Sequence, residues 1–273
     1  MPKKRILIFG GSGFLGNALY KELNSYYNSF ATYKTPKKEF DQNSKFYLFD
    51  YETDLVDILL DAIKPDIIIS AVRGNFTSQV YFHFELMDWI LKNECKLIFL
   101  SSSNVFDSFH HYPSYEYDKT FSESKYGYFK IKIENALLRL PTHKCVIARL
   151  PMIFGHGSPR IQEIKMHHKL KAPIEVFPNV IINATTVSKF TQQIHYLINR
   201  NRKGVFHLGS HDLIHHSELI EDICNELQLN KPLFKQVYNS NEDRYLAAIP
   251  RDNKLPKNLN ISIKEVIKGS LKI

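Results

Sequence analysis

The chain has 273 residues, of which 44% are hydrophobic and 13% aromatic, and it carries a formal net charge of +8 at pH 7. This length suits one large α/β domain or a core with a small second lobe, and the composition excludes a disordered chain. The lysines are scattered, without the arginine-rich tract or basic helix face that follows a nucleic-acid backbone. We therefore expect no nucleic-acid partner, and a modest positive field that would attract an anionic cofactor or a nucleotide-linked substrate.

The sequence carries no pattern typical of secretion or membrane insertion. The first apolar run ends at Gly10, which makes it too short for a signal-peptide core or a membrane span. Cys95, Cys145 and Cys224 are odd in number and widely spaced, which is typical of reduced thiols rather than of a disulfide framework. We expect a soluble, cytoplasmic protein without a membrane partner.

Apolar strand-like runs alternate with helical patterns through the first 150 residues. The predicted strands are Arg5–Phe9, Phe30–Tyr33, Phe46–Leu48, Asp66–Ser70, Lys96–Leu100 and Cys145–Arg149. The predicted helices are Phe14–Leu23, Leu55–Ile63, Tyr81–Lys92 and Tyr126–Leu140. Continuous apolar strands that alternate with helices predict an α/β fold with a Rossmann-type doubly wound parallel sheet.

The pattern becomes less regular after Gly155. Residues 156–182 contain three prolines and mixed charge, which predicts loop with a short helix and little regular sheet. The elements predicted beyond them are a strand at Val205–Leu208, a helix at Ser217–Leu227 with Ser217 as its N-cap, and a short helix from about Ile263.

The segment GGSGFLG at positions 10–16 directly follows the first predicted strand and opens the first predicted helix. Glycines there let the chain turn tightly and present backbone N–H groups at a helix N-terminus, where a dinucleotide pyrophosphate binds. The residues of this turn that we expect to contact NAD(P) are Gly10, Ser12, Gly13, Phe14, Leu15 and Gly16.

The turn assigns a Rossmann domain that binds NAD(P) to residues 1–155. We expect residues 156–273 to form mainly a small substrate-binding lobe, with about 176–210 returning to the core. Such a lobe would cover the carboxyl ends of the strands, where ligands bind in open α/β sheets.

Tyr126 and Lys130 are four residues apart in a predicted helix, so both project from one helix face. A phenol has an ordinary pKa of about 10, and a lysine ammonium one turn away favours the phenolate and lowers that pKa. Ser102 follows a buried strand, where its hydroxyl can hydrogen-bond a substrate carbonyl and the tyrosine oxygen. Tyr-x-x-x-Lys alone occurs often by chance, but together with Ser102 and the glycine turn it indicates a nicotinamide-dependent reductase.

These motifs resemble the extended short-chain dehydrogenases/reductases, and within that superfamily the dTDP-4-dehydrorhamnose reductase family. The resemblance covers most of the chain and is best from residue 4 to about residue 155. The matching positions are Gly10, Gly13 and Gly16, the segment Ser101–Asp107 with the catalytic hydroxyl at Ser102, Glu116 and Asp118, then Tyr126, Gly127, Lys130 and Glu134, and ARLPMIFG at 148–155. Weaker similarity continues at 204–210 and 250–255.

The resemblance implies reduction of the C4 keto group of a nucleotide-linked 4-keto-6-deoxy sugar, for deoxysugar or polysaccharide precursor synthesis. It implies that Tyr126 donates a proton to the developing alkoxide, that Lys130 holds the nicotinamide ribose and that Ser102 orients the carbonyl. Further residues expected at the substrate are Ser103, Asn104, Phe106 and Met152. The expected partner is a nucleotide sugar, and a homodimer is the candidate oligomer.

The chain also departs from the family pattern. Ser70 stands where the family has asparagine, and Val72 and Arg73 stand where it has small residues. We expect Ala71, Val72 and Arg73 beside the cofactor, with Arg73 near the diphosphate or the substrate entrance. The family's carboxy-terminal Arg-Pro reads Ile249-Pro250 here. The resemblance therefore indicates the reaction type more strongly than the particular sugar.

The end of the second predicted strand bears on the choice of cofactor. An acidic residue there would hold the ribose of NAD, but Lys34 ends this run and Lys37 and Lys38 follow it. Cations suit the 2′-phosphate of NADPH, which we prefer to NADH; a solvated lysine-rich loop is the other interpretation. The residues expected beside the adenine are Asp50 and Tyr51.

The sequence predicts no metal site. Its 12 histidines include doublets at 110–111, 167–168 and 215–216, and adjacent histidines point in different directions. No HExxH or paired CxxC motif accompanies them. We interpret the doublets as loop and surface residues.

Three other functions share parts of this pattern. A 4,6-dehydratase would carry an Asp-Glu pair after its catalytic hydroxyl residue, where this chain has Ser103-Asn104. A sugar-nucleotide epimerase typically has a longer carboxy-terminal lobe. A non-catalytic NADP-binding regulatory subunit, like that of methionine adenosyltransferase, would not need the Ser102, Tyr126 and Lys130 set that this chain retains. The epimerase and the regulatory subunit remain the alternatives.

Overall fold

The computed structural model describes residues 3–109, 111–238 and 240–271. The chain forms two compact units. The first unit comprises the described residues up to Ser101 together with Lys125–Ala148 and Ile194–Val205. The second unit comprises Ser102–Ser124, Arg149–Gln193 and the described residues from Phe206 onward.

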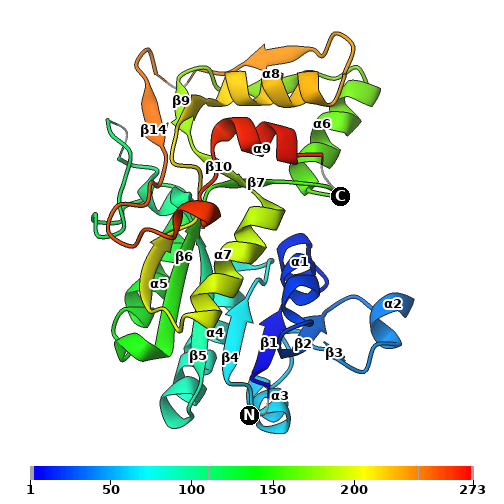
Figure 1. Cartoon of the computed structure of the whole chain (residues 1–273), viewed down its shortest axis with the longest axis vertical. Coiled ribbons are helices and arrows are strands. Elements are labelled where there is room, and N and C mark those ends of the chain that lie inside the picture. The colour runs from blue at the N-terminus through cyan, green and yellow to red at the C-terminus, as the bar shows by residue number, and fades with distance from the viewer. Residues whose placement is uncertain (1–2, 110, 239, 272–273) are drawn as a thin grey trace. The chain divides into compact units, whose positions relative to one another are not determined.

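A seven-stranded sheet runs in the order β11-β6-β5-β4-β1-β2-β3 (Figure 1). Its strands are β1 (Arg5–Phe9), β2 (Asn28–Tyr33), β3 (Phe46–Leu48), β4 (Ile67–Ser70), β5 (Lys96–Ser102), β6 (Cys145–Leu150) and β11 (Gly204–His207). The pairs β1–β2, β1–β4, β2–β3 and β4–β5 are parallel, with Ile8 between Ala31 and Ile69. The strand order changes direction at β1, which places the switch point of a doubly wound sheet beside the glycine turn. The predicted Rossmann-type fold is confirmed.

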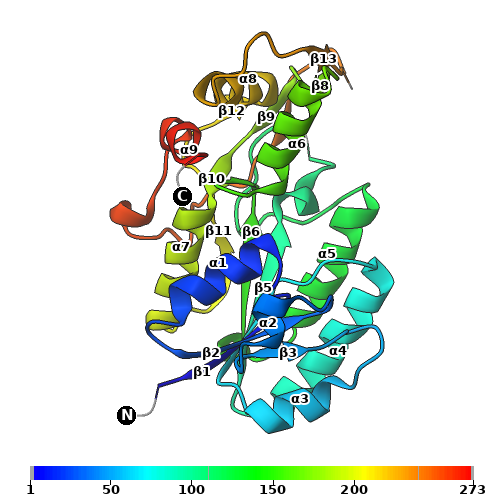
Figure 2. The same ribbon diagram turned by 90° about the vertical axis from the view of Figure 1, so that its right-hand side faces the viewer.

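Helices cover both faces of this sheet within the first unit (Figures 1 and 2). They are α1 (Phe14–Leu23), α2 (Lys38–Asp41), α3 (Val56–Ile63), α4 (Phe76–Lys92), α5 (Lys125–Leu137) and the end of α7 (Val187–Asn199). Leu7 and Phe9 of β1 pack in one core cluster with α3, α4 and α5. Because side chains alternate along a strand, Ile6 and Ile8 point to the opposite face, and both are fully buried.

α4 begins five residues before the predicted start. Asn75 caps it, because its side chain accepts a hydrogen bond from the Ser78 N–H at 3.1 Å. This cap satisfies one of the N–H groups that a helix leaves without an internal partner. The earlier start brings Phe76 and Gln79 into the helix.

Within the described residues, the second unit contains short strands, the beginning of α7 and three complete α-helices. They are β7 (Met152–Phe154), α6 (Pro159–Lys169), β8 (Ile174–Val176), β9 (Val180–Ile182), β10 (Ala184–Thr186), β12 (Ile214–His215), α8 (His216–Glu226), β13 (Phe234–Gln236), β14 (Arg244–Leu246) and α9 (Ile263–Gly269). In the described part of the chain, the short 3₁₀ helices are η1 (Ser103–Phe106) and η3 (Lys257–Leu259) of this unit and η2 (Thr142–Lys144) of the first unit. The small sheets pair β10 with β7, β9 with β12 and β14, and β8 with β13. Apolar side chains of α6, α8 and α9 pack together in one buried cluster.

The local predictions for this part were only partly right. The helix predicted within residues 156–182 is α6, which has 11 residues, because Ser158 caps it through its Oγ and Pro159 occupies the first helical turn. The same segment supplies β8 and β9, which pair with strands far along the chain. Ser217 is not an N-cap, since α8 begins one residue earlier, after His215.

The histidine doublets are not uniformly at the surface. His216 is buried and accepts a hydrogen bond from the Phe177 N–H through Nδ1, whereas His110 lies outside the described residues. Within the described part of the chain, no group of three or more metal-ligating side chains is found. In the same part, no helix has both the length and the apolar character needed to cross a bilayer.

Candidate active site

The glycine turn connects β1 to α1 through close backbone contacts. Gly10 has φ +79°, a region that favours glycine, and a Cβ there would lie 2.6 Å from the carbonyl oxygen of Ala71. A Cβ on Gly16 would collide with the carbonyl oxygen of Gly10. Larger residues at these two positions would therefore push α1 and the loop after β4 away from the turn.

The N-terminus of α1 is left without a side-chain cap, because Gly13 is the N-cap residue. The turn is closed by hydrogen bonds from the Gly13 N–H to the Gly10 carbonyl at 3.0 Å and from the Asn17 N–H to the Gly13 carbonyl at 2.8 Å. The Gly10 N–H donates to Thr32 Oγ1 at 3.0 Å, which fixes the turn to β2. Ser12 precedes the N-cap, and Phe14, Leu15 and Gly16 form the first turn of the helix. This cradle fits a pyrophosphate, since the first N–H groups of a helix lack internal partners and its dipole favours an anion.

Lys34 follows β2 and is held between two carboxylates. Its Nζ lies 2.9 Å from Asp50 Oδ2 and 2.8 Å from Glu52 Oε2. Hydrogen bonds to Glu52 and Asp50 raise the pKa of Lys34 above its ordinary value. The Lys34–Asp50–Glu52 cluster thus has one more negative than positive charge, and sequence reasoning did not single out Glu52.

The loop after β4 packs against the glycine turn and against the turn that follows β3. The Ala71 N–H donates to the Phe9 carbonyl at 2.9 Å, and the Tyr51 hydroxyl donates to the Arg73 carbonyl at 3.2 Å. The Tyr51 side chain therefore contacts the main chain of Arg73. Its hydroxyl helps to hold the loop after β4 in place. Val72 packs against the core beneath it.

Ser70, at the end of β4, forms a buried pair with His83 of α4. Ser70 Oγ lies 2.8 Å from His83 Nε2, and His83 Nδ1 lies 2.6 Å from the Gln79 carbonyl oxygen. Because that carbonyl can only accept, Nδ1 carries the proton and Nε2 accepts from Ser70. Burial lowers the pKa of His83 to about 3, so the ring is neutral. No sequence pattern singles out His83 beyond its place in the apolar helix α4.

Tyr126 and Lys130 lie on α5, as their spacing predicts. The Tyr126 ring is 40% exposed and meets the rings of Phe76 and Phe129 edge-on at 5.9 and 5.5 Å. Lys130 is buried, and its Nζ donates to the Leu100 carbonyl of β5 at 2.8 Å. Burial lowers the pKa of Lys130 to about 7, against the influence of Glu134. An exposed phenol and a buried amine thus stand one turn apart on one helix.

Ser102 is the last residue of β5 and belongs to the second unit. Its Oγ donates to Asn104 Oδ1 at 2.9 Å and accepts from the Asn104 N–H at 3.2 Å. Ser102 thereby caps η1, and its hydroxyl proton is directed at Asn104. The hydroxyl would have to rotate to donate to a substrate carbonyl.

The other residues predicted at the substrate also belong to the second unit. Ser103 is buried, Asn104 is half-buried, and Met152 of β7 packs at the edge of the apolar cluster of α6, α8 and α9. Phe106 is 1% exposed, with its ring 5.8 Å from the His207 ring. Phe106 therefore supports η1 from the interior of this unit.

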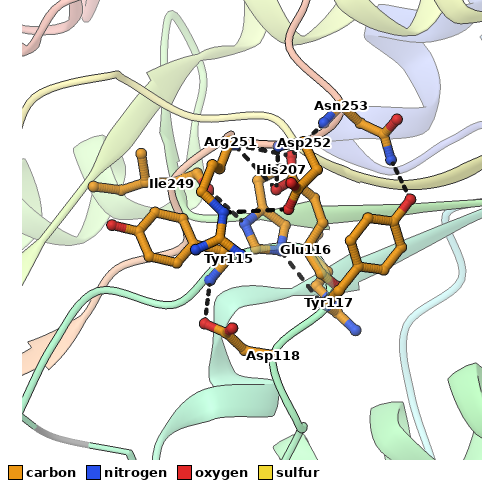
Figure 3. Close-up of polar contacts among 10 residues, drawn as sticks. Tyr115, Glu116, Tyr117, Asp118, His207, Ile249, Arg251, Asp252 and Asn253 are labelled. Atoms are coloured by element: carbon orange, nitrogen blue, oxygen red, sulfur yellow. Dashed lines mark hydrogen bonds and ion pairs between the residues drawn. The ribbon is translucent and has the colours of Figure 1, made fainter.

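Glu116 anchors the segment 251–253 (Figure 3). Its buried carboxylate accepts the backbone N–H groups of residues 251, 252 and 253 at 3.0 to 3.2 Å. The Glu116 carbonyl accepts from Arg149 Nη1 at 3.0 Å. The same Arg149 nitrogen lies 3.3 Å from His207 Nε2, and His207 Nδ1 lies 3.1 Å from the Ile249 carbonyl. Burial and the nearby guanidinium lower the pKa of His207 to about 3, so its ring is neutral.

Two more contacts join the same segments (Figure 3). The Arg251 guanidinium lies 4.1 Å from the centre of the Tyr115 ring, and Asn253 Nδ2 donates to the Tyr117 hydroxyl at 3.2 Å. Asp118 Oδ2 accepts from the Tyr115 N–H at 2.7 Å. The acidic pair that the sequence singled out thus shapes the backbone of the second unit.

Comparison with curated protein sequences gives no match. Solved structures resemble the chain along most of its length. A dTDP-4-dehydrorhamnose reductase from Bacillus anthracis in complex with NADP has a TM-score of 0.78 and 20% identity, over 98% of this chain and 97% of that one. A dTDP-glucose 4,6-dehydratase from the same organism with NAD has a TM-score of 0.80 and 17% identity, over 98% and 95%. The Bordetella bronchiseptica enzyme WbmG with NAD and UDP has a TM-score of 0.78 and 16% identity, over 98% and 94%.

At such identities these structures show the fold alone, which this chain shares with them. A family model adds evidence from the sequence itself. The model described as "RmlD substrate binding domain" matches residues 4–267, nearly the whole chain. With the glycine turn, the doubly wound sheet and the Tyr126–Lys130 pair in place, we conclude that this chain belongs to the RmlD substrate binding domain family.

Proposed function

We propose that this protein is an NADPH-dependent reductase of the C4 keto group of a nucleotide-linked 4-keto-6-deoxy sugar. The main support is the arrangement on α5, where a solvent-accessible Tyr126 stands one turn from a buried Lys130 that is fixed to β5. β5 ends at Ser102, the third residue of the proposed catalytic set. The family model and the reductase among the similar structures support the same reaction.

In this proposal the glycine turn holds the pyrophosphate, and Ala71, Val72 and Arg73 line the cofactor beside it. Lys130 holds the nicotinamide ribose, and Asp50 and Tyr51 lie by the adenine. The bound NADPH supplies a hydride. The second unit binds the sugar nucleotide, with Ser103, Asn104 and Met152 at the substrate.

The protein's own side chains would supply the proton and orient the carbonyl. Tyr126 donates its phenolic proton to the oxygen of the reduced carbonyl, since a positioned acid contributes most when it stands at that atom. A protonated Lys130 favours the phenolate that Tyr126 becomes. Ser102 rotates its hydroxyl away from Asn104 and orients the carbonyl.

The direct test mixes the purified protein with NADPH and a panel of nucleotide 4-keto-6-deoxy sugars and follows the absorbance of the reduced cofactor. Oxidation with one sugar identifies both the reaction and the substrate. Tight NADPH binding with no oxidation by any sugar would favour a regulatory subunit. A changed sugar stereoisomer without net cofactor oxidation would indicate an epimerase.

The choice between NADPH and NADH depends on Lys34 in this proposal. Replacing Glu52 by glutamine removes one of the two carboxylates that neutralise Lys34, which frees positive charge for the 2′-phosphate. We expect the NADPH-to-NADH ratio of kcat/KM to rise by about threefold to tenfold, because the pair is partly exposed. Parallel titrations of both cofactors measure it.

Glu94→Gln is the matched control, since it removes a carboxylate that is 97% exposed at Lys144. An unchanged ratio in Glu52→Gln would place the 2′ position away from Lys34. A tenfold or greater preference of the wild-type protein for NADH would overturn the choice of NADPH itself.

A further inference from the structure

We propose that Glu134 is a positioning residue that keeps the buried Lys130 protonated and thereby sustains its action on the cofactor ribose and on Tyr126. Glu134 acts through Lys130 and does not itself touch the substrate. This inference rests on the proposed reductase function for its consequence in catalysis, but its physical basis is a property of the protein alone.

The surroundings of Lys130 are unfavourable for a charge. Its Nζ lies 4.6 Å from the centre of the Phe99 ring and 5.0 Å from that of the Phe129 ring. The Lys130 Nζ donates a hydrogen bond to a neutral acceptor, the Leu100 carbonyl. Aromatic faces and one carbonyl replace only part of the hydration that an ammonium loses on burial. The pKa of Lys130 is accordingly lowered to about 7, which is close to neutral pH.

Glu134 is the group that opposes this loss. It lies one turn beyond Lys130 on α5, so the two side chains share a helix face, and it is 1% exposed. Its Oε1 accepts a hydrogen bond from Ser101 Oγ of β5. Consecutive residues of β5, Leu100 and Ser101, therefore hold consecutive turns of α5 through Lys130 and Glu134. The attraction of the Glu134 carboxylate raises the pKa of Lys130 against the larger effect of burial.

Among the residues that the structure describes, the other titratable side chains that face Lys130 are Tyr126 of α5 and His83 of α4. From its own helix Tyr126 faces it, with Lys130 Nζ 5.9 Å from the ring centre, and a phenol is neutral near pH 7. From α4 His83 faces it, and that ring is neutral because its pKa is about 3. β5 contributes the Phe99 ring, the Leu100 carbonyl and the Ser101 hydroxyl. Among these described neighbours the Glu134 carboxylate is the counter-ion.

The consequence is a shift in the pH range over which Lys130 is charged. With its pKa near 7, Lys130 is about half protonated at neutral pH. A small further decrease in this pKa would therefore leave most of the Lys130 side chains uncharged at that pH. Loss of the Glu134 carboxylate should therefore lower the activity mainly above neutral pH. There Lys130 becomes a neutral amine, which no longer favours the Tyr126 phenolate. A lower pH restores the ammonium and the activity.

The test measures the protonation of Lys130 in the cofactor-free protein. Lysines carry ¹³C at Cε, and the Lys130 resonance is the one absent from Lys130→Met. Its shift is followed from about pH 5 to pH 10 in wild type and Glu134→Gln. We expect the midpoint to fall by about one pH unit or more in Glu134→Gln, and to stay unchanged in Glu94→Gln. An unchanged midpoint in folded Glu134→Gln would overturn the proposal.

A second variant covers the case in which Glu134→Gln does not fold. Glu134→Asp keeps the charge but withdraws it by one methylene, so its midpoint should lie below that of wild type. A midpoint equal to wild type in Glu134→Asp would then overturn the proposal. A purely structural role would lower the melting temperature without moving either midpoint.

Kinetics separate this inference from the proposed function. Once a sugar substrate is found, the alkaline limb of the pH profile of kcat/KM should move to lower pH in Glu134→Gln, with activity regained near pH 6. A moved Lys130 midpoint with no sugar reduced by wild type would support the Glu134 role and overturn the reductase. Wild-type reduction with an unmoved midpoint would do the reverse.

Discussion

Replacing Tyr126 by phenylalanine is expected to lower kcat by at least about 10²-fold, and up to about 10⁴-fold, because the variant lacks the acid that protonates the carbonyl oxygen. The affinity for NADPH should change little. The ring contacts of residue 126 with Phe76 and Phe129 are apolar and remain available to phenylalanine. Steady-state assays and a cofactor fluorescence titration measure the two quantities.

Tyr128→Phe provides the matched control, since Tyr128 lies on the same helix and is 67% exposed. It should retain wild-type turnover. Unchanged turnover in Tyr126→Phe would rule out the acid role of this phenol and with it the assignment of α5 as the catalytic helix.

Replacing Lys130 by methionine is expected to change how stability depends on pH. The folded protein holds the pKa of Lys130 at about 7, below the ordinary lysine value of 10.5, so between these pH values the unfolded chain binds a proton that the folded chain lacks. The free energy of unfolding of wild type therefore increases with pH across this window. Lys130→Met lacks this contribution. Between about pH 7 and pH 10 the stability of wild type relative to Lys130→Met should increase by roughly 2–5 kcal/mol.

Urea unfolding at three pH values across the window measures this difference, and Lys132→Met is the control. Lys132 lies on the same helix with an exposed side chain, so its removal should leave the pH dependence of wild type unchanged. Parallel stability curves for wild type and Lys130→Met would mean that Lys130 titrates normally in the folded protein.

The prediction of the sheet succeeded where local pattern and tertiary burial agree. β1 and β4 are continuous apolar runs that helices cover on both faces, so their sequence alone indicates buried parallel strands. α1 begins at Phe14 as predicted. The glycines before Phe14 disfavour helix because they lose much conformational entropy in it, so they mark where the helix starts. In the second unit the strands have three residues or fewer and pair with distant segments, so no local pattern identifies them.

The candidate site was likewise predictable only where a local pattern marks it. Spacing places Tyr126 and Lys130 on one face of α5, because the helical repeat relates residues four apart. The partners that set their chemistry came from other elements. The sequence does not reveal that β5 holds Lys130 and Glu134 through Leu100 and Ser101, since these pairs are 30 and 33 residues apart.

The amino-acid sequence by itself indicated the doubly wound sheet, the glycine turn and the Tyr126–Lys130 pair, because each leaves a local pattern in the chain: apolar runs that alternate with helical segments, closely spaced glycines, and a four-residue spacing. Only the tertiary structure decided that Glu52 neutralises Lys34, that Glu116 grips residues 251–253 and that Lys130 is buried beside Glu134. Whether a charge is compensated or desolvated depends on which distant segments pack together in the folded protein. The neighbours of a residue in the sequence do not reveal that packing.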